Sequence, residues 1–187
     1  FIENFFEDRS YKQILKYWPN INFFSQSSNI LKSYSTGFGD MSDKKFNYFI
    51  SVKNLFKFIK SLEFEKSINE LLKFEQKKYF NYSIGLSMVG NNSYLAPHID
   101  GVQTEKSKTY NFIFFIDGNN SNPSLSGGTG LYSDNNFEKP IFIPTTLKNS
   151  VLIYNSTSEF YHGFNFTILD KTTFRKTINF QFFPKDL

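Results

Sequence analysis

The chain has 187 residues and a formal net charge of +4, and 20% of its residues are aromatic. This length fits one domain with a sizeable core, and 25 Phe and 11 Tyr side chains can fill the space between two sheets. Because the chain has no cysteine, disulfides, iron–sulfur clusters, thiolate zinc sites and cysteine nucleophiles are excluded, so any bound metal must use nitrogen and oxygen ligands.

The distribution of charge and apolar residues argues against two classes of partner. The lysines are scattered along the chain, which is typical of a solvated surface and not of a nucleic-acid-binding stripe. No apolar run approaches the roughly 20 residues needed to span a bilayer, and no targeting signal is visible in the residues given. We therefore expect a cytoplasmic protein that binds neither nucleic acid nor membranes, although a leader removed beforehand is compatible with this sequence.

The first part of the chain carries helical signals. A helix is expected over residues 7–17, where Pro19 ends it, and a third helix over residues 64–74. Between them, a second helix is expected, with Ser51 as its cap. Its apolar residues recur along one helical face: Val52, Leu55, Phe56 and Ile59.

From residue 77 onward, the pattern changes to short β-rich runs separated by Asn, Gly, Ser and Pro. About seven such runs occur: YFNYSIGLSMV, TYNFIFFI, GLYS, IFIP, SVLIY, EFYH and TFRKTINFQFF. Short strands separated by turn signals favour a sandwich or barrel over βαβ units. We expect one domain over residues 1–187, in which residues 1–76 are mostly helical and cover one sheet of a β core formed by residues 77–187.

The two histidines of the chain suggest a metal site. His98 and Asp100 are two residues apart on an extended segment, so their side chains point to the same side, and His162 ends a separate β-rich run. Two imidazoles and one carboxylate on one face leave adjacent positions open, as in non-haem Fe(II) sites, whereas zinc more often takes a closed tetrahedron. The alternative is that His98 and Asp100 form a surface turn while His162 binds a backbone carbonyl in the core.

The last β-rich run has one apolar and one polar face. Strand alternation places Arg175, Thr177, Asn179 and Gln181 on the polar face, opposite Phe174, Ile178, Phe180 and Phe182. If the polar face lines the interior, the arginine requires an anionic partner, which a dicarboxylate would supply. Its guanidinium can bind a carboxylate through two hydrogen bonds, and the Thr177 hydroxyl can donate another. The alternative is a terminal strand whose polar face lies in water.

These residues resemble the motif of the 2-oxoglutarate/Fe(II) oxygenase superfamily, and within it the prolyl-hydroxylase-like branch. The resemblance implies that His98, Asp100 and His162 are the catalytic iron ligands, and that Arg175 binds the distal carboxylate of 2-oxoglutarate. It also implies a mainly β (α+β) fold: a double-stranded β-helix, or jelly-roll, barrel with N-terminal helices packed on one sheet.

Further positions follow from the same resemblance. The run TYNFIFFID is similar to the strand after the His-x-Asp loop, so Asn111, Ile113 and Phe115 would face the cosubstrate. Several relatives have a Tyr at the position of Phe115. The pair Gly127-Gly128 resembles the glycine pair that precedes the next strand. Residues 118–126 and 25–43 are candidate substrate-covering lids.

The activity implied is that of a dioxygenase that hydroxylates a C–H bond of a peptidyl residue or small metabolite, using Fe(II), 2-oxoglutarate and O2 and releasing succinate and CO2. Asp100 favours hydroxylation, because halogenating relatives have a small residue there. Nucleic-acid demethylases of the superfamily usually have a second arginine, which would fall at Gln181. The glutamine at this position argues against that activity. Two alternatives stay open, both on a jelly-roll scaffold: a cupin-like metal- or small-molecule-binding protein, and an inactive member that serves as a sugar-binding or interaction module.

Overall fold

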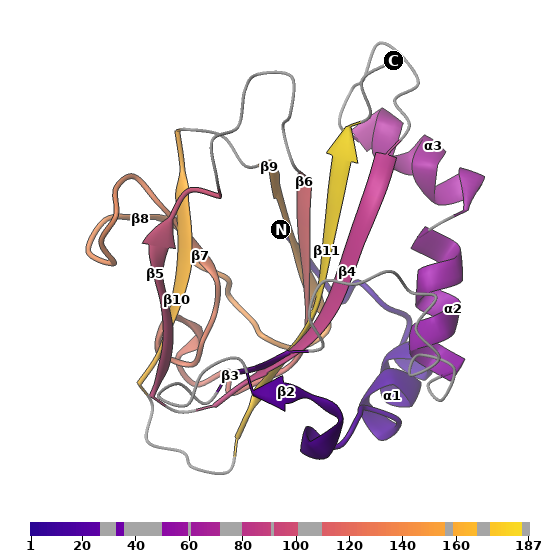
Figure 1. Cartoon of the computed structure of the whole chain (residues 1–187), viewed down its shortest axis with the longest axis horizontal. Helices are drawn as coiled ribbons and strands as arrows, with labels where there is room; N and C mark the ends of the chain where they lie inside the picture. Colours follow the sequence, from indigo (N-terminus) through magenta and orange to yellow (C-terminus); the bar gives the residue numbers. More distant parts are fainter. Residues whose placement is uncertain are drawn as a thin grey trace.

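The computed structural model describes residues 1–26, 33–35, 50–59, 61–71, 80–90, 92–100, 110–155, 159–167 and 173–184. These residues form two antiparallel β-sheets and three α-helices (Figure 1). The two-sheet, mainly β architecture is consistent with the predicted jelly-roll-like fold.

The larger sheet has seven strands in the order β1-β9-β6-β11-β4-β3-β2. Their bounds are β1 Ile2–Glu3, β9 Ser150–Asn155, β6 Tyr110–Asp117, β11 Arg175–Pro184, β4 Phe80–Val89, β3 Ser33–Ser35 and β2 Ser25–Gln26. The smaller sheet has four strands in the order β5-β10-β7-β8. Their bounds are β5 Ser93–His98, β10 Tyr161–Phe166, β7 Gly130–Tyr132 and β8 Pro140–Phe142.

The three α-helices are α1 (Asp8–Lys16), α2 (Ile50–Ile59) and α3 (Leu62–Leu71). Two short 3-10 helices, η1 (Ile21–Phe23) and η4 (Pro123–Leu125), complete the helical part. None of these described helices has the length and apolar character required to cross a membrane.

The expected helices are largely present, with one correction. Helix α1 occupies the expected position, but the prediction that Ser51 caps the second helix is wrong, because α2 begins one residue earlier and Ser51 lies inside it. Helix α3 instead begins after Ser61, whose Oγ accepts a hydrogen bond from the Phe64 amide at 3.2 Å. The predicted end of this helix at residues 72–74, and most of the candidate lid at 25–43, lie outside the described residues.

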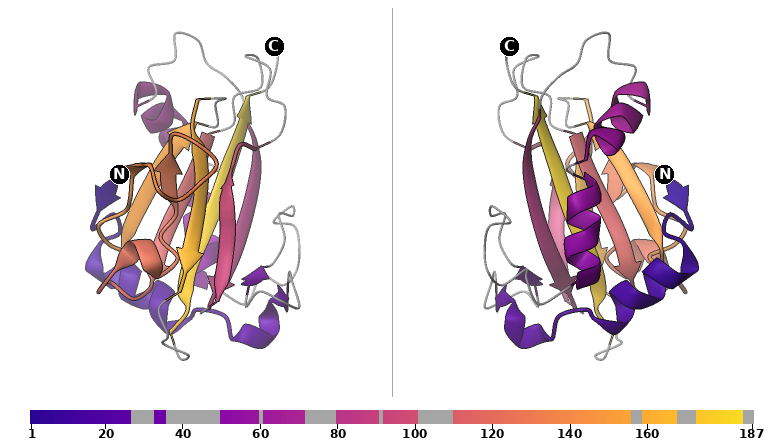
Figure 2. Two further views of the ribbon diagram at one scale, coloured as in Figure 1. Left: turned by 90° about the vertical axis from the view of Figure 1, so that its left-hand side faces the viewer. Right: turned by 90° about the vertical axis from the view of Figure 1, so that its right-hand side faces the viewer.

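The main hydrophobic core lies between the helices and one face of the seven-stranded sheet (Figure 2). Strand β11 contributes Ile178, Phe180 and Phe182 to this core, in agreement with the predicted alternation. The core contains residues from all three helices and from four strands: Ile14, Leu55, Ile59, Phe64, Ile68, Ile84, Leu86, Met88, Phe112, Phe114, Ile116, Val151, Ile178, Phe180 and Phe182. The opposite face of the sheet, which carries Arg175, faces the four-stranded sheet across a cavity.

Removing core volume tests this arrangement. Ile116 is 0% exposed in the core, whereas Ile141 on β8 is 51% exposed. The Ile116→Ala variant should lose about 2–5 kcal/mol of unfolding free energy, because buried methyl groups are removed and a cavity is left. The matched Ile141→Ala variant should change it by less than about 0.5 kcal/mol. Urea unfolding measures both values, and equal losses would contradict the assigned core.

Candidate metal centre and the adjoining cavity

Antiparallel pairing of β5 with β10 brings the two histidines together. His98 and His162 are register partners across these strands, and the centroids of their rings are 4.3 Å apart. The register shifts between His162 and Phe164, around Gly163. A Cβ at Gly163 would lie 2.5 Å from the Leu95 carbonyl oxygen, so glycine is needed for the close approach of β5 at this point.

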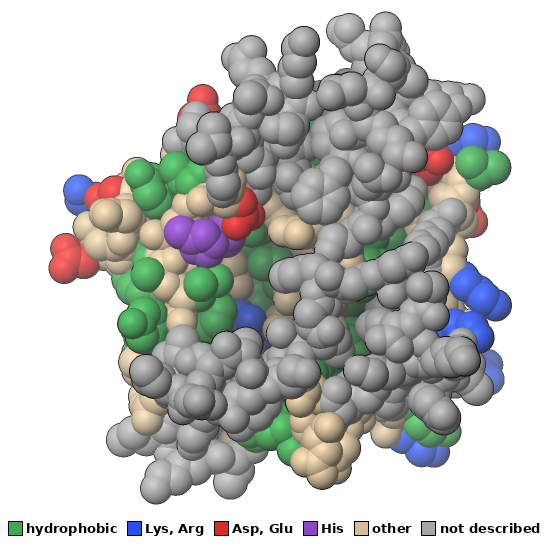
Figure 3. Space-filling view, in the orientation of Figure 1, with side chains coloured by type: hydrophobic (Ala, Val, Ile, Leu, Met, Phe, Trp, Pro, Cys, Tyr) green, Lys and Arg blue, Asp and Glu red, His purple; other side chains and the backbone are tan. Residues whose placement is uncertain are grey.

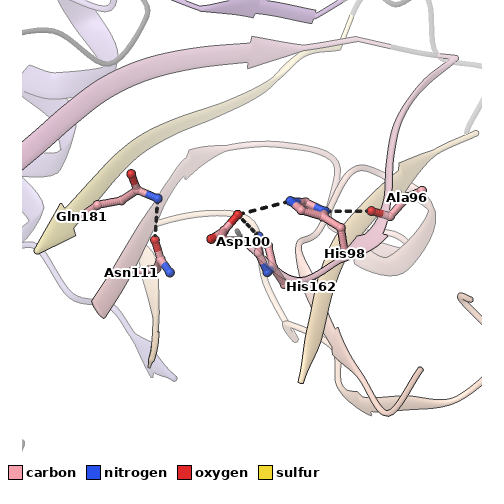
Figure 4. A network of polar contacts seen from close by, with 6 residues as sticks. All are labelled: Ala96, His98, Asp100, Asn111, His162 and Gln181. Atoms are coloured by element: carbon pink, nitrogen blue, oxygen red, sulfur yellow. Dashed lines mark hydrogen bonds and ion pairs between the residues drawn. The ribbon is translucent and has the colours of Figure 1, made fainter. Parts of the chain in front are cut away.

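The carboxylate of Asp100 lies beside both rings and contacts each of them (Figure 4). Its Oδ1 is 3.4 Å from His98 Nε2 and 3.5 Å from His162 Nε2. The three potential ligand atoms all lie within 4.8 Å of one another. The predicted convergence of the three side chains is therefore present. Two nitrogen donors and one oxygen donor in this arrangement suit a divalent transition metal.

The histidines are oriented as metal ligands require. His98 Nδ1 lies 2.9 Å from the Ala96 carbonyl oxygen and must be the donor to it, so in the neutral imidazole the unprotonated nitrogen is Nε2, on the side of Asp100. Burial lowers the pKa of His162 to about 4, an effect that Asp100 opposes and His98 reinforces. The His162 imidazole is therefore neutral at neutral pH, the form that binds metal.

A cavity of about 300 Å³ joins this cluster to the inner face of the seven-stranded sheet. Figure 3 shows a histidine side chain beside an acidic one on the face of the molecule where the cluster lies. The cavity is lined by Ser87, Val89, Leu95, His98, Asp100, Asn111, Phe112, Ile113, Thr129, Tyr154, His162, Phe164, Arg175, Asn179, Phe180 and Gln181.

Arg175 lines the same cavity and is 4% exposed. Its Nη1 donates hydrogen bonds to the Gly127 carbonyl at 2.5 Å and to Thr129 Oγ1 at 3.1 Å. Its guanidinium carbon lies 4.3 Å from the centroid of the Phe164 ring. Burial lowers the pKa of Arg175 to about 9, so the side chain is charged at neutral pH.

This buried cation lacks an anion within the described part of the chain. No carboxylate among the described residues forms an ion pair with Arg175, and its buried Nε has no hydrogen-bond partner there. An unpaired buried charge is strongly unfavourable, because its desolvation is not offset. Arg175 is therefore suited to bind an anionic group of a ligand in the cavity.

Of the other predicted cosubstrate contacts, two line the cavity and two do not. Asn111 and Ile113 on β6 line the cavity. Phe115, on the same face, is fully buried against Leu147 and Leu152 and is not among the described lining residues.

Thr177, on the same face of β11 as Arg175, is also fully buried and is not among the described lining residues. Its hydroxyl is 2.7 Å from that of Ser87, which does line the cavity. Thr177 thus contacts a residue that lines the cavity without lining it itself. Ser87 was not predicted from the sequence, because only its pairing with Thr177 across β4 and β11 identifies it.

The sequence did not single out Tyr154 as a cavity residue. Its ring centroid is 5.3 Å from that of His162. Burial raises the pKa of Tyr154, and the nearby Asp100 carboxylate raises it further, so the phenol keeps its proton. Alternation along SVLIY places Tyr154 on the same face as Leu152, but no pattern in the sequence indicates that this face meets His162.

Comparison with known proteins shows similarity in structure and none in sequence. No protein-family model matches the chain, and no curated protein matches it significantly. Among solved structures, a Pseudomonas putida prolyl-4-hydroxylase is similar with a TM-score of 0.62 at 7% identity, covering 100% of this chain and 91% of that one. A Trichoplax adhaerens prolyl hydroxylase, in complex with a hypoxia inducible factor peptide fragment, is similar with a TM-score of 0.61 at 13% identity, covering 97% and 81%.

HygX from Streptomyces hygroscopicus, with nickel, 2-oxoglutarate and hygromycin B bound, is also similar. Its TM-score is 0.60 at 10% identity, over 98% of this chain and 82% of HygX. At such identities, the likeness establishes the fold. This chain has the fold of the prolyl hydroxylases and of HygX, and the predicted resemblance to the 2-oxoglutarate/Fe(II) oxygenases is confirmed at that level.

The requirement for glycine at position 163 can be tested directly. The Gly163→Ala variant should lose about 1–3 kcal/mol of unfolding free energy, because the added Cβ meets β5 backbone that must move. The shift should also displace His98 and weaken binding of Co(II), measured by calorimetry. Asn165→Ala, on the same strand, serves as the control. Unchanged Co(II) affinity in Gly163→Ala would show that the pairing does not position the histidines.

Loss of the carboxylate should abolish the metal site. We expect Asp100→Ala to bind Co(II) more than about 100-fold more weakly, because it removes a direct ligand and even partners of metal ligands contribute 10–100-fold. Asp134→Ala removes a partly exposed carboxylate, paired with Lys139, and should leave Co(II) affinity unchanged. If both variants bound Co(II) like the parent protein, the metal would lie elsewhere.

Proposed function

We propose that this chain is an Fe(II)- and 2-oxoglutarate-dependent dioxygenase. It hydroxylates a C–H bond of a peptidyl residue or a small metabolite and releases succinate and CO2. In this proposal, residues 1–187 form one domain, in which a double-stranded β-helix barrel encloses the cavity and the N-terminal helices support the larger sheet.

The observation that carries the proposal is the buried Arg175, which has no carboxylate partner among the described residues and shares one cavity with His98, Asp100 and His162. The cavity therefore offers an anion-binding group at one place and a nitrogen/oxygen metal site at another. 2-Oxoglutarate has a carboxylate at one end and a 2-oxo acid at the other. The residues present thus fit both the metal and the cosubstrate.

Each residue has a defined task in this proposal. His98, Asp100 and His162 would hold the iron, with the Asp100 carboxylate offsetting part of its charge. Bound iron supplies activation of O2, coupled to oxidative decarboxylation of 2-oxoglutarate. Arg175 binds the distal carboxylate of 2-oxoglutarate.

The surrounding side chains orient the cosubstrate and limit the entry of water. Ser87 contacts the distal carboxylate directly. Thr177 orients the Ser87 hydroxyl through the hydrogen bond between the two side chains. Asn111 and Ile113 contact the cosubstrate from β6, and Phe115 packs beside Ile113 on the same face of that strand. Apolar lining residues, among them Val89 and Phe164, restrict access of water.

The similar solved structures support the proposal. HygX has been seen with nickel and 2-oxoglutarate bound, and the Trichoplax protein is a prolyl hydroxylase seen with a peptide. Both share this fold over nearly the whole of the present chain. A peptidyl or small-molecule substrate is compatible with these two examples.

Reconstitution without oxygen tests the proposed function. Addition of Fe(II) and 2-oxoglutarate under anaerobic conditions should produce the weak visible charge-transfer absorption of the chelate, and admission of O2 should then yield succinate. The Asp100→Ala variant should show neither signal. If metal-loaded parent protein also showed neither, the chain would be a metal- or sugar-binding module.

Arg175→Ala separates binding of the cosubstrate from binding of the metal. We expect the variant to bind 2-oxoglutarate at least about tenfold more weakly, because a charge-assisted bidentate contact contributes more than 1.4 kcal/mol. Its Co(II) affinity should be unchanged. Arg9→Ala, on helix α1, is the matched control. Loss of Co(II) binding in Arg175→Ala, with 2-oxoglutarate affinity retained, would contradict the role of Arg175.

A further inference from the structure

A row of polar side chains crosses three neighbouring strands at the metal end of the cavity. From it we infer, building on the proposed function, that Gln181, held by Asn111 and flanked by Tyr154, is a specificity-determining residue. It selects an uncharged substrate that presents an amide group near the C–H bond to be hydroxylated.

The row follows from strand register. Asn111 on β6 is the register partner of Tyr154 on β9 and of Gln181 on β11. All three side chains line the cavity that contains the metal ligands. Figure 4 draws the Asn111–Gln181 pair together with the metal-ligand cluster.

A hydrogen bond within the row sets the orientation of the Gln181 amide. Gln181 Nε2 donates to Asn111 Oδ1 at 2.8 Å. This leaves the Gln181 carbonyl oxygen as an acceptor and its second N–H as a donor. No further hydrogen bond of the Gln181 side chain is made with the described residues, and Figure 4 shows its oxygen turned away from Asn111. Gln181 can therefore both accept from and donate to a ligand.

The position of Gln181 separates it from the proposed cosubstrate anchor. Gln181 is six residues after Arg175 along β11, which corresponds to about 20 Å at roughly 3.3 Å per residue. A five-carbon diacid anchored on Arg175 is much shorter than that. At the other end, the Tyr154 ring is 5.3 Å from the ring of His162. Within the row, Asn111 is therefore the residue within reach of the metal-bound end of the cosubstrate, whereas Gln181 lies where a substrate, and not 2-oxoglutarate, would be bound.

The charges of the cavity favour a neutral ligand there. Among the described lining residues, Asp100 and Arg175 are the charged ones, and both already have tasks in the proposed function. The chain as a whole has a net charge of +4, but no lysine or arginine among the described lining residues lies beside Gln181. In the loaded site, the formal charges of the divalent metal, Asp100, dianionic 2-oxoglutarate and Arg175 cancel, so an anion beside Gln181 would lose hydration without gaining a net positive charge, whereas an amide would exchange water for matched hydrogen bonds.

Small probes test this inference without knowledge of the substrate. Protein loaded with paramagnetic Mn(II) and saturated with 2-oxoglutarate is mixed with N-methylacetamide or with the weakly coordinating anion methanesulfonate, and the relaxation of the probe methyl protons is measured. Relaxation of the amide probe should be enhanced above that in a Mn(II)-free sample, and more than that of the anion. Gln181→Leu should weaken amide binding about fivefold, the effect of one hydrogen bond. Gln181→Arg should reverse the preference.

The control is Gln13→Leu, which makes the same chemical change on helix α1. This variant should bind the amide probe like the parent protein. Absence of amide enhancement, a preference for methanesulfonate in the parent protein, or an unchanged result in Gln181→Leu would overturn the inference. Binding of 2-oxoglutarate is measured first. If it fails, the proposed function is at fault and this inference falls with it, whereas intact binding with a failed probe result concerns Gln181 alone.

Discussion

Antiparallel pairing of β5 with β10 is the constraint on which the site depends. It sets His98 opposite His162, and Gly163 allows the two backbones to approach where the register shifts. Asp100 follows β5 and lies against both imidazoles. A metal site formed in this way needs no ligand from a flexible side chain on the far sheet, because backbone pairing holds the two nitrogen donors in place.

The seven-stranded sheet contributes a charged side chain and several polar side chains to the same cavity. Arg175 is held by a carbonyl oxygen and a hydroxyl from residues before β7, and it still has a buried N–H without a partner among the described residues. This arrangement preserves the geometry of the guanidinium while leaving its charge available to a ligand. The two faces of β11 thus have separate tasks: aromatic residues stabilise the helix–sheet core, and polar residues line the cavity.

Patterns of period two and the scarcity of histidine account for what the sequence could predict. The alternation in β11 identified both of its faces, and the two histidines with Asp100 identified the cluster. Strand β5 was not predicted, because SYLAPH lacks clear alternation and contains a proline. The burial of Phe115 behind Leu147, and the approach of Tyr154 to His162, depend on contacts between segments far apart in the chain. Local periodicity carries no information about such contacts.

In the proposed function, one ligand connects the metal cluster to Arg175. A crystal structure of the protein prepared anaerobically with Co(II) and 2-oxoglutarate, with anomalous scattering used to locate the metal, tests it most directly. We expect cobalt bound by His98, Asp100 and His162, and the distal carboxylate of 2-oxoglutarate paired with Arg175. Cobalt bound elsewhere, or an Arg175 guanidinium paired with a carboxylate of the protein itself, would contradict it.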